Sequence, residues 1–125
     1  MKDLQSMLGP IITIAAAAIT STVNGETVDL QGFNSAAIII TPGTITDGTH
    51  TPKVEESDNG SDWSDVAAGD LVGSLSALAS DTVQKVGYKG TKRYIRVTST
   101  VAGATSGGVY SALVVRGHPN LAPVE

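Results

Sequence analysis

The segment from Lys92 to Gly117 carries the clearest alternation of polar and apolar positions in the chain. From Arg93 to Val101 apolar side chains fall on one face and polar ones on the other, which predicts a half-buried strand. The mostly apolar run Val109–Arg116 predicts a strand at the centre of a sheet with both faces covered. Gly103–Gly108 lies between them and contains residues that tolerate turn dihedrals. We therefore expect the two strands to pair as a long antiparallel hairpin.

Short strands separated by turn signals are predicted along the rest of the chain. The expected strands cover residues 11–19, 26–30, 35–41, 50–57 and 81–88. The turn signals are Asn24-Gly25, Pro42-Gly43, Asp47-Gly48 and Asp58–Ser61. Residues 67–80 are expected to form a loop with a short strand or helical turn. About seven or eight short antiparallel strands predict an all-β, single-domain β-sandwich, either jelly-roll-like or immunoglobulin-like. The Cys…Trp…Cys pattern of immunoglobulin domains is missing.

The 125 residues suffice for one domain with a single sizeable core. We predict an N-terminal arm over residues 1–10, a β-sandwich domain over 11–117 and an extended C-terminal tail over 118–125. The arm can form about two helical turns that end at Gly9-Pro10, as an interface element, as a frayed terminus or as a flap over its own core. The candidate partner contacts are Leu4, Met7 and Leu8 in the arm and His118, Pro119 and Leu121 in the tail.

The apolar run Ile11–Ile19 raises the question of a membrane or secretion signal. It is much shorter than the ~20 residues of a membrane-spanning helix. Lys2 is balanced by Asp3, and polar residues, Gly9 and Pro10 separate them from the run, so a basic segment does not directly precede it. We expect a buried strand, although the alanines in the run are compatible with a helix.

Charge narrows the range of partners. Charged residues make up 16% of the chain, which favours strands over helices and suggests that another chain covers part of the surface. The net charge is −4, with eight Lys and Arg spread along the sequence, so we expect neither nucleic acid nor an anionic membrane as partner. The cluster Lys89, Lys92, Arg93 and Arg96 is expected to be solvated or ion-paired.

Candidate chemistry is sparse, and we expect no enzyme, cofactor or metal. The chain has no cysteine, its two histidines are His50 and His118, and no G-x-S-x-G motif accompanies them. The carboxylates of Glu55–Asp65 resemble a calcium loop, but Gly60 follows Asp58 too closely for the EF-hand spacing. A solvated turn, in which Asp58 or Asn59 caps its own backbone, is the favoured interpretation.

Trp63 is the only tryptophan, and it stands next to this turn. A lone tryptophan in a small β-domain usually fills the core, and we expect the same here. The alternative is an exposed ring that contacts a ligand. In that case the chain would be a lectin-like binding module that uses Trp63 and Asp58–Asp65 for sugar or calcium.

Two long phrases, Thr27–Val66 and Val83–Pro119, with the loop between them, resemble small virion proteins of tailed bacteriophages. The most specific parts are EESDNGSDW, VGYKGTKRYIRV and GGVYSALVVRGHP. The named group that they resemble is the jelly-roll capsid cement, or decoration, proteins. Residues 1–18 lie outside the resemblance.

The resemblance implies a β-sandwich that binds the outside of an assembled capsid, usually as an oligomer, and clamps neighbouring major capsid subunits together. The expected partners are therefore the major capsid protein and further copies of this chain, as a dimer or trimer. The expected location is the capsid surface of the virion, after synthesis in the host cytoplasm. A neck or tail component present in few copies is an alternative within the virion.

Overall fold

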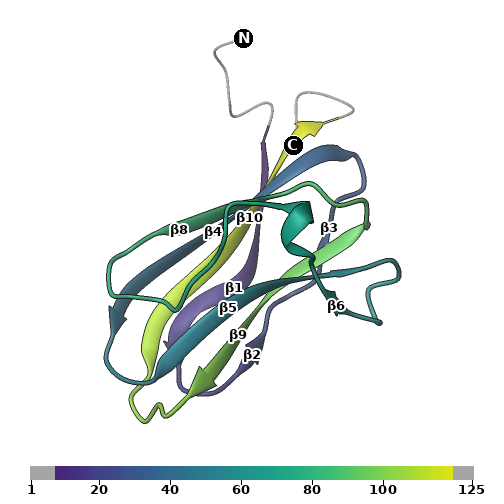
Figure 1. Ribbon diagram of the computed structural model, residues 1–125. Helices are drawn as coiled ribbons and strands as arrows, with labels where there is room; N and C mark the ends of the chain where they lie inside the picture. Colours follow the sequence, from purple (N-terminus) through teal and green to yellow (C-terminus); the bar gives the residue numbers. More distant parts are fainter. Residues whose placement is uncertain (1–7, 120–125) are drawn as a thin grey trace.

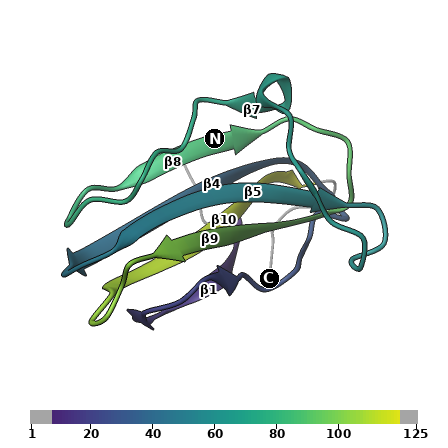
Figure 2. The same ribbon diagram turned by 60° about the horizontal axis from the view of Figure 1, so that its bottom comes forward.

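The chain folds into two antiparallel sheets that pack face to face (Figures 1 and 2), as predicted for an all-β sandwich. The computed structural model describes residues 8–119, with the side chains of the last two of these left aside. The first sheet, sheet A, has the order β1 (Gly9–Ile19), β10 (Gly108–Pro119), β4 (Phe33–Ile45), β8 (Gln84–Tyr88) and β7 (Leu71–Val72). Sheet B contains β2 (Val23–Asn24), β9 (Tyr94–Ala102), β5 (Thr49–Ser57) and β6 (Ser64–Asp65), and β3 (Val28–Asp29) also pairs with β9. The short 3₁₀ turn η2 (Ala68–Asp70) precedes β7.

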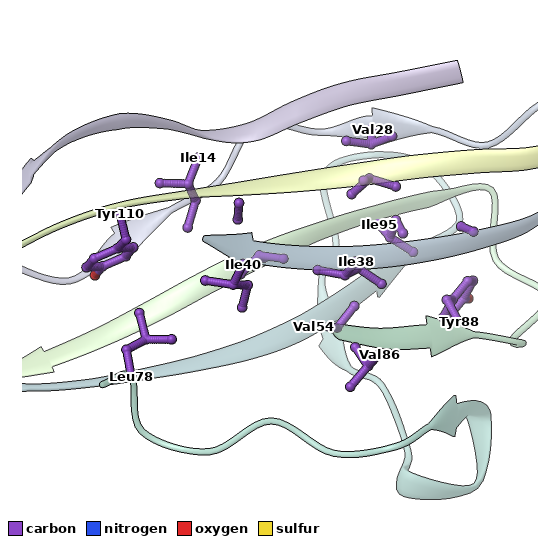
Figure 3. Close-up of a cluster of buried hydrophobic side chains, with 14 of the residues drawn as sticks. Ile14, Val28, Ile38, Ile40, Val54, Leu78, Val86, Tyr88, Ile95 and Tyr110 are labelled. Atoms are coloured by element: carbon purple, nitrogen blue, oxygen red, sulfur yellow. The ribbon is translucent and has the colours of Figure 1, made fainter. Parts of the chain in front are cut away.

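The hydrophobic core lies between the two sheets and is built by alternate residues of the central strands (Figure 3). Ile38 and Ile40 of β4 and Val114 of β10 point inward from sheet A, while Ile95 and Val97 of β9 meet them from sheet B. Each of these side chains is fully buried. The alternation of residues along each strand thus determines which side chains point into the core.

The predicted hairpin between residues 92 and 117 is wrong, although both of its strands exist. β9 pairs with β5, β2 and β3 in sheet B, whereas β10 pairs with β1 and β4 in sheet A. The connection between them therefore crosses from one sheet to the other. Both strands have an apolar face, and in opposite layers the two faces bury each other across the core.

The other predicted turns are confirmed only in part. Asp58–Ser61 does join two paired strands, β5 and β6, as a turn between neighbours. Asp47-Gly48 is a turn, but it leads from β4 in sheet A to β5 in sheet B. Asn24-Gly25 is not a hairpin turn, because Asn24 belongs to β2 and pairs with Thr98 of β9, while the preceding β1 lies in sheet A.

Gly25 instead helps to close one edge of the sandwich. Its N–H donates to the Val97 carbonyl at 2.7 Å, and the next residue, Glu26, donates from its N–H to the Thr13 carbonyl at 2.5 Å. The Thr13 hydroxyl returns a 2.8 Å hydrogen bond to the carbonyl of Glu26. These bonds tie β1 of sheet A to β9 of sheet B at the side where the sheets come together.

Candidate interaction surfaces

The outer face of sheet B is polar, and its charges are paired. The Glu55 carboxylate accepts hydrogen bonds from Arg96 Nε at 2.9 Å and from the Thr98 hydroxyl at 2.6 Å. Lys53 lies 3.1 Å from Asp65 on the neighbouring strand. Burial raises the pKa of Glu55, but the Thr98 and Arg96 hydrogen bonds and the nearby cations together bring that pKa below its ordinary value. This face is suited to water.

Trp63 lies on this polar face and not in the core, so the predicted core position is wrong. Its ring packs under the Arg96 guanidinium, whose carbon is 4.3 Å from the ring centroid, and the side chain is only half-buried. The adjacent turn leads the chain away from the core before β6, which places the ring over the outside of the sheet. A lone tryptophan carries no signal that separates a core position from such a cation–π position.

The outer face of sheet A is mostly apolar, and its polar members on β4 and β10 are the uncharged residues Ser35, Thr41 and Ser111. Residues that face outward from neighbouring strands are direct partners in the register and form rows across the sheet. We call the following nine residues the apolar face: Pro10, Ile12, Ala18, Ala37, Ile39, Val72, Val109, Leu113 and Val115. The relative solvent exposure is 57% for Ile12, 47% for Val109 and 61% for Val72.

The apolar face carries almost no charge. Among the described residues of these strands that point outward, Lys85 of β8 is the only charged one. Lys85 forms no ion pair with another described residue. An antiparallel sheet with one solvated side normally alternates apolar-in with polar-out, as sheet B does. Contiguous exposed apolar surface on this scale is typical of a protein–protein contact.

The sequence contained the signal for this surface. The apolar run of β10 was expected to have both faces covered, and the runs of β1 and β4 were expected to be buried strands. The low charge was expected to reflect cover by another chain. In the structure these strands are neighbours in one sheet, and their inner halves form the core. Their outer halves form the apolar face, on which Ile12 and Val109 stay exposed.

Both ends of the described chain lie at the same end of the sandwich (Figure 1), where β1 begins and β10 ends. Gly9 pairs with Arg116, and Pro119 pairs with Phe33. Leu8 is the one predicted contact residue whose side chain is described; it is half-buried and lies next to Gly117. His118 and Pro119 are backbone members of β10, and Leu4, Met7 and Leu121 lie outside the described residues.

Two arginines stabilise this end. Arg93 forms two hydrogen bonds with the Asp29 carboxylate, at 3.0 and 2.9 Å, and they hold the pKa of that carboxyl below its ordinary value. Arg116 donates to the Gly9 and Asp29 carbonyls at 3.0 and 3.1 Å, and its guanidinium lies over the Phe33 ring. These contacts connect β1, β3 and β10 with the residue that directly precedes β9.

A cleft of about 420 Å³ opens beside these arginines. Its walls are the connection from β3 to β4, with Leu30 and Phe33, and the connection from β8 to β9, with Lys92 and Arg93. The cations at its rim are already paired, Lys92 with Asp58 at 2.8 Å and Arg93 with Asp29. The predicted ion pairing of the basic cluster is confirmed for Lys92 and Arg93, and also for Arg96, which pairs with Glu55. Lys92 and Arg93 therefore offer no free positive charge to a ligand in the cleft.

His50 is buried, and it is held by a polar network inside the sandwich. Its Nδ1 lies 3.1 Å from the Tyr110 hydroxyl, which in turn lies 2.8 Å from the Ser99 hydroxyl. The other ring nitrogen lies 3.0 Å from the Asp47 carbonyl. The imidazole has 0% exposure, so a substrate cannot reach it without opening the core.

The acidic turn after β5 satisfies its own backbone. The Asn59 side-chain oxygen accepts hydrogen bonds from the N–H groups of Ser61 and Asp62 at 2.8 and 2.9 Å. This agrees with the favoured interpretation of a self-capping turn. In the part of the chain that the structure describes, there is no group of three or more His, Cys, Asp or Glu side chains arranged to hold a metal ion. Among residues 8–119, the structure also has no helix with the length and apolarity needed to span a bilayer.

Comparison with known proteins shows the fold and no family. No family model and no curated protein matches the chain. Among solved structures, the crystal structure of the SPBc2 prophage-derived protein YomS is similar, with a TM-score of 0.57 and 18% sequence identity over 88% of this chain and 93% of that one. A structure of infectious bursal disease virus, Gx strain, matches with a TM-score of 0.44 and 13% identity over 93% of this chain and 34% of the viral chain. This chain therefore shares its sandwich fold with a prophage-derived protein.

Proposed function

We propose that this chain is a structural protein of a bacteriophage particle, and specifically a cement protein that binds the outside of the capsid and stabilises it. The observation that carries the proposal is the apolar outer face of sheet A, since such a face is typical of a protein–protein contact and cement proteins act as oligomers on an assembled shell. The shared fold with a prophage-derived protein and the sequence resemblance to phage cement proteins support the same function.

The proposed mechanism needs no catalysis, cofactor or metal. A protein that binds the assembled shell but not its dissociated subunits stabilises the shell by mass action. Many copies on a symmetric lattice add their weak contacts, so the total effect exceeds the affinity of any single contact. A stiff β-core suits this role, because little conformational entropy is lost on binding.

We assign the contact with the major capsid protein to the end of the sandwich where β1 begins and β10 ends. Leu8 lies at this end beside Gly117. The other proposed contact residues precede Leu8 in the sequence or follow Gly117. They are Leu4, Met7, His118, Pro119 and Leu121. Nucleic acid and membranes are not proposed as partners, in keeping with the net charge of −4.

The first test is the copy number of this chain in purified virions, measured by quantitative mass spectrometry against the major capsid protein. Copies in the tens to hundreds, comparable with the shell protein, support the cement role. A handful per particle would instead assign the chain to the neck or tail. Absence from particles would overturn both virion roles.

A second candidate function follows from Trp63. Its half-buried ring on the polar face is compatible with the lectin-like module considered from the sequence. In that case Trp63→Ala would abolish saturable sugar or calcium binding while the fold stays intact. Titration calorimetry with a panel of sugars, with and without calcium, decides whether any such binding exists.

A further inference from the structure

We propose that two copies of this chain pack face to face through the apolar face. The twofold axis that relates them lies in the interface, is parallel to the strands and passes between β10 and β4. The inference concerns the free protein in solution, so it does not depend on the proposed function. Three properties of the face identify a second copy as its occupant: its size, its lack of charge and the order of residues in its rows.

The size of the face matches that of a stable dimer contact. β1, β10, β4 and β8 have 11, 12, 13 and 5 residues. At ~3.4 Å per residue and ~4.8 Å between strands, these four strands cover roughly 670 Å². A standard interface buries ~800 Å² on each partner. One copy can therefore cover the whole outer face of another.

The lack of charge favours self-association. A twofold contact brings the same surface together with itself, so a face with several charges of one sign would repel its own copy. Here the single outward-pointing cation among the described residues of these strands is Lys85, on β8 near the margin of the sheet. A positively or negatively charged partner surface would find no complement on this face.

The central row of the face determines the direction of the axis. Ile12, Leu113, Ile39 and Lys85 are direct partners across β1, β10, β4 and β8. An axis parallel to the strands places Leu113 against Ile39 of the other copy, and Lys85 against its Ile12. The Lys85 stem then lies along an apolar side chain while the ammonium extends past the edge strand into water. An axis across the strands at this row would place the two Lys85 side chains together, and like-charge repulsion opposes that arrangement.

The neighbouring row has the shape that this axis requires. Pro10, Val115, Ala37 and Gly87 follow one another across the same four strands. The rotation brings Val115 against Ala37 of the other copy, and Pro10 against its Gly87. Large side chains thus meet small ones, which lets two sheets approach to the ~10 Å of a packed sandwich.

Sedimentation equilibrium of the full chain tests the proposal. The expected mass for the wild type is twice the 12.7 kDa of one chain. Ile12→Lys should weaken the dimer tenfold or more, because the new cation faces Lys85 of the other copy. The monomer should stay folded, since the Ile12 side chain is already 57% exposed. Val109→Lys, at another exposed position of the face, gives a second variant with the same expectation.

A charge swap tests the axis itself. In the double variant Ile12→Lys with Lys85→Glu, each new lysine faces a new glutamate of the other copy, and dimerisation should recover. Thr100→Lys, at an exposed position on the outer face of sheet B, serves as the matched control and should leave the dimer unchanged. Circular dichroism is the measurement that shows whether each variant is folded.

Four outcomes would overturn the proposal. They are a wild type that remains monomeric up to about 100 µM, a trimer, a dimer that Ile12→Lys and Val109→Lys leave intact, and a charge swap that fails to recover the dimer. A monomer that binds capsids through Ile12 and Val109 would show that the shell occupies this face. That last result would support the proposed function while it rejects the self-association.

Discussion

Asp47 and Gly107 bond to each other in both directions across two loops that lie far apart in the sequence. The Gly107 N–H donates to the Asp47 carboxylate at 2.7 Å, and the Asp47 N–H donates to the Gly107 carbonyl at 3.2 Å. The same carboxylate accepts the N–H groups of Thr105 and Ser106 at 3.0 and 3.2 Å. The pair thereby fastens the connection from β4 to β5 onto the connection from β9 to β10, two of the connections at which the chain crosses from one sheet to the other.

Asp47→Asn should lower the melting temperature, because the amide keeps one acceptor oxygen and loses the charge. The measurement is thermal unfolding by circular dichroism at pH 7. Glu26→Gln makes the same carboxylate-to-amide change at an exposed position without a side-chain hydrogen bond in the described structure, and it should be neutral. An equal effect of both substitutions would show that the Asp47 contacts contribute nothing specific.

Stability should fall in acid, and Asp47 should account for part of that fall. The hydrogen bonds from Gly107, Ser106 and Thr105 lower the pKa of Asp47, and the Arg93 contact lowers the pKa of Asp29. A carboxyl whose pKa is depressed by folding contributes stability above its unfolded value of ~3.9, and that contribution is lost as the pH falls through the folded pKa. Urea unfolding from pH 7 to 2 should therefore show Asp47→Asn approaching the wild type below about pH 4.

Tyr110→Phe should reduce the free energy of unfolding by about 1–3 kcal/mol, because the buried His50 and Ser99 would each lose a hydrogen-bond partner. Tyr94→Phe is the control, because Tyr94 is half-buried on the outer face of sheet B. This substitution should change the free energy of unfolding by less than about 0.5 kcal/mol. Chemical denaturation of both variants gives the comparison. Equal stabilities would mean that water replaces the lost hydroxyl.

Gly25→Ala should destabilise the fold by about 1–3 kcal/mol or more. A Cβ at this position would lie 2.4 Å from both the Thr13 hydroxyl and the Val97 carbonyl oxygen, and the latter belongs to the backbone of a central strand. Gly69→Ala, where a Cβ meets nothing within 4 Å, is the matched control. Denaturant unfolding of the two variants should separate them clearly; a neutral Gly25→Ala would indicate that this edge of the sandwich can open.

Trp63→Ala should cost about 1 kcal/mol, because the ring contributes a partly exposed cation–π contact with Arg96. A tryptophan in the core would cost ~3–5 kcal/mol. Equilibrium unfolding of this variant, followed by circular dichroism, measures the difference. A loss in the core range would contradict the surface position of the ring.

The pattern of the sequence predicted strands well and their partners poorly. The runs that became β1, β4, β5, β8, β9 and β10 were all recognised, because alternation and β-branched side chains are local properties. The pairing of β9 with β10 was not predictable in the same way. A glycine-rich connection allows both a hairpin within one sheet and a crossing between two, and only the burial of both apolar faces decides between them.

The candidate surfaces show the same division. The self-capping turn at Asn59 follows from residue types next to each other, and the sequence indicated it correctly. Trp63 was misplaced because its position depends on Arg96, 33 residues further along the chain. The network of His50, Tyr110 and Ser99 was missed for the same reason, since its members come from three strands in two sheets.

By itself the sequence determined the all-β class, the position of the long strands and the shortage of charge, because each depends on residues within a few positions of one another. Only the tertiary structure decided that β1, β10 and β4 lie side by side, and therefore that their outward-facing residues Ile12, Leu113 and Ile39 form one continuous apolar surface. The physical reason is that a strand's inner face is set by its own alternation, whereas the neighbours of its outer face are set by sheet order, which the whole chain decides at once.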